Sequence, residues 1–166
     1  SDKERLKELE LAANAGQVDE NTIFKIYKQI PFSLNELVNA KNIYPTLENS
    51  DARPLIYQKY LLSEDNDLKI EYLFLLEELF KKANLLNIYS NFLSEEILKI
   101  GIENISERYQ ETAESRIISK NKFLLGKIKY NDKILHQSKI IKYYIEDENE
   151  KKVQKDIDKI FKKISK

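Results

Sequence analysis

The chain of 166 residues contains no cysteine, no methionine and no tryptophan. Without cysteine it can form no disulfide, no thiolate metal site and no cysteine nucleophile, and its compartment stays open between cytoplasm and periplasm. No stretch approaches the roughly 18 consecutive apolar residues of a transmembrane helix, and no signal-peptide core remains. We therefore expect a soluble protein. Because translation begins at methionine, its absence predicts a fragment or processed form of a longer chain.

Glycine and proline are also scarce, with three residues of each, and both are costly inside helices. Lys and Arg together number 28, as do Asp and Glu, so the formal net charge is zero. No whole-molecule field therefore draws the chain toward nucleic acid or a membrane. Hydrophobic residues make up 42% of the chain, enough for one domain over residues 1–166 with its own core.

Helix-start signals are the most informative feature that is present. Side-chain oxygens precede apolar stripes at Asp19, Ser33 and Ser94, and Ser33 with Glu36 predicts a capping box. Since no strand pattern competes, the sequence predicts an all-α fold. The expected helices are Asp2–Asn14, Asp19–Ile30, one from Ser33, one from Ser50 or Asp51 with Pro54 near its first turn, Leu68–Ala83, Asn84–Phe92, Ser94–Ile105, Ser106–Tyr130, one around Ile134–Ile145, and one from Asp147.

Short connections between successive helices favour antiparallel hairpins. We expect these hairpins to form a short right-handed array of the α-solenoid kind, with a closed helix bundle as the alternative. The most hydrophobic helix, Leu68–Ala83, is expected to be buried most. Leu75, Leu76 and Leu79 should be among the least exposed residues.

Two places resemble the helical hairpins of tetratricopeptide repeat proteins. The small residues of Leu11-Ala-Ala-Asn-Ala-Gly16, followed by Val18 and Asp19, are similar to that family's tight turn between paired helices. Leu125-Gly126, with Ser138 on the next helix, resembles its Leu-Gly pair and small packing residue. The match covers about a fifth of the chain and departs from the family at three lysines, where the family has aromatic side chains: Lys122, Lys129 and Lys142. The resemblance implies a protein-interaction scaffold without catalysis.

No motif with catalytic, cofactor-binding or metal-binding chemistry is recognisable. His136 is the single histidine and lacks both a Glu three residues before it and a nucleophile-elbow serine. The acidic pairs Glu77-Glu78 and Glu95-Glu96 are sequence neighbours, which point about 100° apart on a helix and cannot chelate together. The three glycines are too widely spaced for a phosphate-binding loop. We expect no enzyme, no cofactor and no metal.

Two groups of residues remain as candidates for binding. Tyrosine offers rigid apolar area with one polar tip, so a tyrosine pair can line a partner-binding groove or sit at the core boundary. The candidate tyrosines are Tyr57, Tyr60, Tyr143 and Tyr144. The main prediction is a non-enzymatic scaffold for a protein or peptide. The alternative is a binder of nucleic acid or anionic membranes through one face of the last helix, with Lys152, Lys155, Lys159, Lys162 and Lys163.

Overall fold

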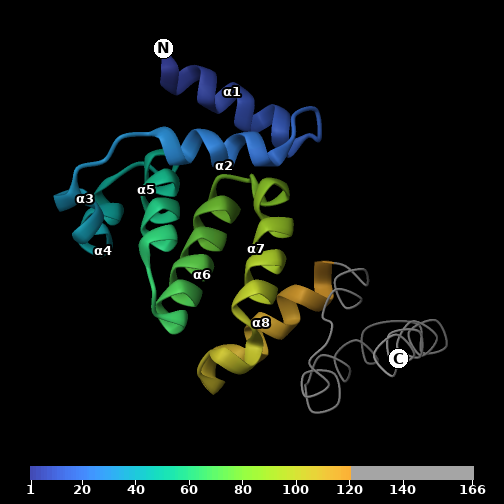
Figure 1. Ribbon diagram of the computed structural model, residues 1–166. Coiled ribbons are helices and arrows are strands. Elements are labelled where there is room, and N and C mark those ends of the chain that lie inside the picture. The colour runs from blue at the N-terminus through green and yellow to red at the C-terminus, as the bar shows by residue number, and fades with distance from the viewer. Residues whose placement is uncertain (121–166) are drawn as a thin grey trace. The chain divides into compact units, whose positions relative to one another are not determined.

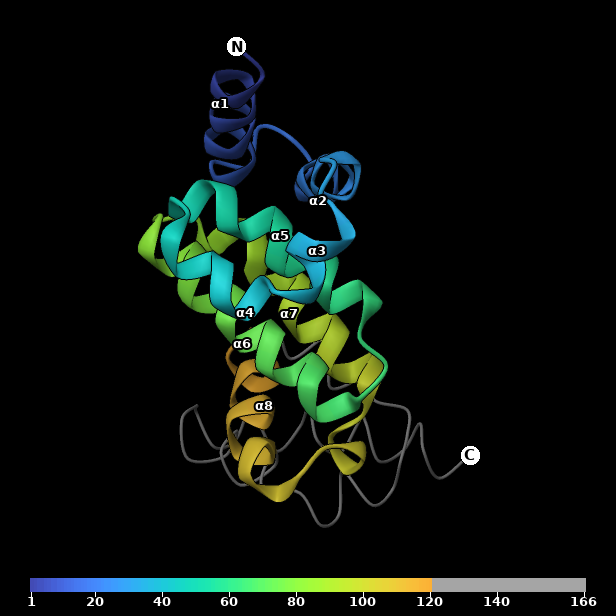
Figure 2. The same cartoon turned by 90° about the vertical axis from the view of Figure 1, so that its left-hand side faces the viewer.

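The computed structural model describes residues 1–120 (Figures 1 and 2). Within them the chain forms eight α-helices and two short 3₁₀-helices and no strand, which confirms the all-α prediction. The elements are α1 Asp2–Asn14, α2 Glu20–Gln29, α3 Leu34–Val38, α4 Ala40–Ile43, η1 Tyr44–Thr46, α5 Asn49–Leu62, α6 Asn66–Lys82, α7 Leu86–Ile100, η2 Ile102–Asn104 and α8 Glu107–Lys120.

The chain divides into two compact units, residues 1–93 and residues 94–166. The expectation of a single domain stays a prediction, because two compact units can belong to one domain. The expected helices beyond residue 120 lie outside the described part.

Side-chain caps begin several helices where the sequence predicts them. The Asp19 carboxylate accepts from the backbone N–H of Asn21 at 3.0 Å, and the Ser33 hydroxyl accepts from that of Glu36 at 3.1 Å. The full capping box at Ser33 is not formed, because the Glu36 carboxylate accepts from the Ser33 hydroxyl instead of the backbone. Asp65 caps α6 in the same way as Asp19 caps α2. The cap prediction is therefore confirmed for the start of α2 and of α3.

Two helices end in a left-handed residue. Gly16, with φ of +79°, follows α1, and the N–H of Gln17 reaches back to the carbonyl of Ala12 at 2.9 Å. Asn84, with φ of +57°, follows α6, and the N–H of Leu85 reaches the carbonyl of Phe80 at 2.9 Å. These paired turns satisfy carbonyls that a helix end otherwise leaves without a donor. Gly16 is the predicted C-terminal signal of α1, whereas the turn at Asn84 lies where a helix start was expected.

Two predicted boundaries are wrong. Helix α5 begins at Asn49, earlier than Ser50 or Asp51, and this earlier start places Pro54 inside the helix. No side chain caps the start of α5. Helix α7 runs without a break through Ser94, which was expected to start a new helix. The hydroxyl of Ser94 donates to the carbonyl of Arg116 on α8 at 3.1 Å. Ser94 therefore lies inside α7, where there is no free helix start for its side chain to cap.

The core of residues 1–93 lies where α2, α5, α6 and the first half of α7 meet. Figure 1 shows α5, α6 and α7 side by side, with α1 and α2 crossing one end. Rings fill this core: Phe80 stacks on Tyr89 with 4.8 Å between centroids, and Phe24 stacks on Phe92 at 4.4 Å. The Tyr89 hydroxyl donates to the carbonyl of Leu73 and so joins α7 to α6. Aromatic packing therefore connects helices that are distant in sequence.

Burial corrects the prediction about the central helix. Leu76 is fully buried and Leu79 nearly so, as expected, but Leu75 is only half-buried. Helix α6 buries six residues and the shorter α5 buries seven, so Leu68–Ala83 is not the most buried segment. Helix α5 is covered by α2 and α3 as well as by α6, which explains the difference.

Candidate functional site

The structure places Tyr57 and Tyr60 in the core, each with 4% of its surface exposed. Tyr57 packs edge-on against Phe92, with 5.6 Å between centroids. Buried rings form no accessible groove, so this tyrosine pair is corrected from a candidate binding surface to core packing. The other candidates, Tyr143, Tyr144 and the lysines of residues 152–163, lie outside the described residues, as does His136, and their roles stay predictions.

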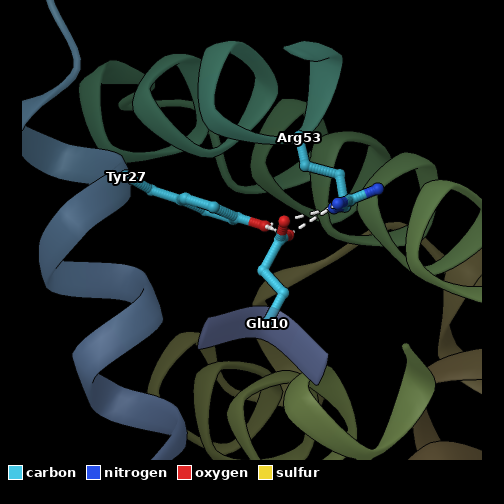
Figure 3. A network of polar contacts seen from close by, with 3 residues as sticks. All are labelled: Glu10, Tyr27 and Arg53. Atoms are coloured by element: carbon cyan, nitrogen blue, oxygen red, sulfur yellow. Dashed lines mark hydrogen bonds and ion pairs between the residues drawn. The ribbon is translucent and has the colours of Figure 1, made fainter. Parts of the chain in front are cut away.

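A buried polar network joins three helices (Figure 3). Glu10 of α1, Tyr27 of α2 and Arg53 of α5 are at most 2% exposed. One carboxylate oxygen of Glu10 accepts from the Tyr27 hydroxyl at 2.5 Å and from Nη2 of Arg53 at 2.6 Å. Nε of Arg53 also donates to the Tyr27 hydroxyl oxygen at 3.1 Å, so each residue contacts the other two. The network ties α1 and α2 to α5.

The surroundings of this network point to a structural role. The Arg53 guanidinium lies over the Phe80 ring, 5.3 Å from its centroid, and its buried Nη1 makes no hydrogen bond. Burial raises the pKa of the Tyr27 hydroxyl far above its ordinary value, and the Glu10 carboxylate raises it further while Arg53 opposes them. Tyr27 therefore stays protonated and donates to Glu10. All three side chains are buried, and their hydrogen bonds join α1, α2 and α5.

Stability at alkaline pH tests the protonation of Tyr27. Its pKa is raised on folding, so its contribution is fully present below pH 10.0 and is lost as pH rises above that value, where the unfolded chain ionises. We expect the unfolding free energy of the native protein to fall by up to about 1.4 kcal/mol per pH unit more than that of Tyr27→Phe. Urea titrations of both proteins at several alkaline pH values measure this difference. Parallel profiles would contradict the assignment.

The network was missed at the sequence level although a signal existed. Glu10 occupies a position on the apolar stripe of its helix, between Leu6 and Ala13, where an isolated charge is unexpected. Arg53 is one of only four arginines and stands among Ala52, Pro54 and Leu55. Charged residues at stripe positions indicate buried partners, because a buried charge must be paired.

A pocket of about 630 Å³ lies beside α1, α2 and the start of α5. One group of apolar lining residues comes from α1, α2 and the segment after α2: Leu6, Ile26, Ile30, Pro31 and Phe32. A second group comes from α4, the residue after η1, and α5: Ile43, Leu47 and Pro54. Asp2, Lys3 and Pro31 are exposed, so the pocket reaches the surface. Pockets of 300–1,000 Å³ with mainly apolar walls are typical of binding sites.

Hydrogen bonds at the end of α2 hold one wall in place. Pro31 forces Ile30 out of the helical conformation, to φ of −69° and ψ of 121°. The carbonyls of Tyr27 and Ile30 both accept from the Gln58 amide of α5, each at 2.6 Å. This link turns the chain away from α2 and places Ile30, Pro31 and Phe32 beside α5.

Polar contacts along α1 hold the opposite wall. Glu10 and Ala13 are the buried residues of α1, and Leu6 and Leu9 are half-buried, so polar contacts supplement its apolar packing. Nζ of Lys3 pairs with the Asp51 carboxylate at 3.2 Å. At the other end of α1, the Asn14 amide donates to the carbonyl of Asn84 at 3.3 Å. These contacts and the buried network attach α1 to α5 and to the turn after α6.

The polar part of the lining is predominantly acidic. Asp2, Glu36 and Asp51 contribute carboxylates, and Lys3 is the single cation among the lining residues. Residues 1–93 as a whole carry fifteen Asp and Glu against eleven Lys and Arg. The pocket therefore combines apolar walls with an acidic edge.

Residues 1–120 contain no group of three or more histidine or acidic side chains arranged to hold a metal ion. In the same part of the chain, no helix has both the length and the apolar character needed to cross a membrane. Comparisons of the sequence with protein-family models and with curated proteins, and of the fold with solved structures, find no match.

Proposed function

We propose that the chain is a non-enzymatic helical scaffold that binds a protein or peptide through the pocket of residues 1–93. Its walls are aliphatic and proline side chains with one phenylalanine, which suit a partner's apolar side chains. The lining contains no histidine, and the buried network of Glu10, Tyr27 and Arg53 does not line the pocket. The proposal rests chiefly on this apolar pocket.

The helix order is compatible with an array of hairpins like those of tetratricopeptide repeats. Helices α1 and α2 are joined through Gly16 and Asp19, the turn that resembles that family. Helices α5 and α6 are joined by residues 63–65, and their close packing fits a second hairpin. We propose this arrangement as the scaffold's architecture. In such arrays the partner binds a surface shared by successive hairpins.

Selection of peptides from a displayed random library against the full chain tests this function. Selected peptides should lose at least about tenfold in affinity for Ile43→Asn, because a polar amide then replaces an apolar wall residue without a change of charge. Leu62→Asn is the matched control, since Leu62 is 61% exposed and does not line the pocket. Its affinity should stay within about twofold.

Fluorescence anisotropy measures the affinities, and circular dichroism verifies that both variants are folded. The proposal is wrong if no peptide is enriched, or if Ile43→Asn and Leu62→Asn weaken binding equally.

A further inference from the structure

We infer that the pocket binds a basic amphipathic segment of a partner protein, with aliphatic side chains inside and Lys or Arg beside the acidic edge. This inference rests on the proposed function and names the chemistry of the partner. It follows from three features of the site: the composition of the walls, the placement of charge, and the small number of hydrogen-bond donors.

The aliphatic walls of the pocket indicate that the partner contributes apolar side chains. Ile26 and Ile30 are one turn apart on the same face at the end of α2, and Ile43 and Leu47 come from a separate part of the chain. All four are half-buried, so part of each side chain remains available to a ligand. An amphipathic helix presents residues at i, i+3, i+4 and i+7, and such a row fits a groove with aliphatic walls.

The acidic edge of the pocket indicates that the partner also contributes positive charge. Asp2 lies in the first turn of α1, Glu36 on α3 and Asp51 in the first turn of α5, so acids come from three separate elements around one pocket. Lys3 is paired with Asp51, which leaves the lining with two acids in excess. A partner's cations beside this edge gain complementary charge, whereas carboxylates are repelled.

The scarcity of donors argues against a small polar ligand. Small-molecule sites fix their ligand by a few well-placed polar groups that converge on it. Of the polar lining residues, only Lys3 and Ser50 can donate from their side chains, and Lys3 is already paired with Asp51. The Glu36 carboxylate accepts from the hydroxyl of Ser33. A longer segment needs no such set, because its specificity comes from the spacing of apolar anchors and flanking charges.

The test uses three synthetic helical peptides of about 15 residues with identical leucine and isoleucine positions. Their polar positions carry lysine, glutamine or glutamate. Anisotropy titrations with the full chain should rank affinity as lysine, then glutamine, then glutamate, and added salt should weaken the lysine peptide most.

A charge-matched pair of variants locates the effect. Asp2→Asn, Glu36→Gln and Asp51→Asn together should lower affinity for the lysine peptide about three- to tenfold. Glu8→Gln, Glu64→Gln and Glu78→Gln remove the same charge from exposed acids that do not line the pocket, and should change affinity less than about twofold. If the triple edge variant is unfolded, the salt dependence of the native chain for the three peptides replaces it.

The outcomes separate the two proposals. Equal affinity of the lysine and glutamine peptides, or equal losses in both triple variants, would overturn the basic-segment inference. The scaffold function would survive that result if binding still depended on Ile43. If no peptide binds with dependence on Ile43, both proposals fail. Binding of dodecyltrimethylammonium without binding of any peptide would assign the pocket to a small cationic amphiphile. A dimer in sedimentation that is lost in Ile43→Asn would assign the pocket to a second copy of the chain.

Discussion

Replacement of Arg53 by alanine is expected to lower the free energy of unfolding by about 3–5 kcal/mol. The substitution leaves the Glu10 carboxylate 1% exposed and without its cationic partner at 2.6 Å. The Tyr27 hydroxyl remains as a donor to Glu10, but one neutral donor does not compensate a buried charge. Urea unfolding followed by circular dichroism measures the loss.

Two further variants test this explanation. Lys3→Ala removes an ion pair at 3.2 Å whose lysine is 74% exposed, and it should cost less than about 1 kcal/mol. The triple variant Glu10→Leu, Tyr27→Phe and Arg53→Met removes every member of the network while retaining apolar volume. It should be more stable than Arg53→Ala, because no buried charge or hydroxyl is left without a partner. A triple variant less stable than Arg53→Ala would contradict this reading of the network.

Replacement of Leu76 by alanine is expected to cost about 2–5 kcal/mol. Leu76 is fully buried in α6, so truncation removes apolar contacts and leaves a cavity. The adjacent Leu75 is half-buried on the same helix and provides a matched control. Leu75→Ala should cost no more than about 1.5 kcal/mol, because less surface is withdrawn from water. Equal losses in the two variants would contradict the orientation of α6.

The sequence predicts helices well where the signal is local. Caps at Asp19 and Ser33 and the turn at Gly16 depend on groups a few residues apart, and all three are present. Ser94 offers the same local signal, but its hydroxyl bonds to the carbonyl of Arg116, which is 22 residues away. The local signal fails there because α7 continues through Ser94, so no helix start is left for its side chain to cap.

The sequence predicted which segments are helical better than it predicted which face of each helix is buried. Helix α6 is apolar over a wide arc, so the pattern alone does not separate Leu75 from Leu76. In the short α3, the apolar residues Leu34 and Val38 are 77% and 63% exposed. A helix of five residues presents little more than one turn to its neighbours, so one of its faces must remain in solvent.

The candidate site could not be predicted because it depends on residues that are separate in sequence. The pocket walls come from residues 6 to 54 and include the ends of several elements instead of one stripe. One wall of the pocket depends on Pro31, which ends α2, and on Gln58, which hydrogen-bonds to carbonyls at the end of that helix. Tyr57 and Tyr60, two of the tyrosines that suggested a groove, instead lie in the core, where their rings bury apolar area.

The most direct test of the account is the isoleucine methyl spectrum of the full chain during titration with a selected peptide. We expect progressive shifts for Ile26, Ile30 and Ile43, which line the pocket, and little change for the fully buried Ile70 and Ile88. Peptide binding that leaves the three pocket isoleucines unchanged would contradict the central claim that this pocket is the binding site.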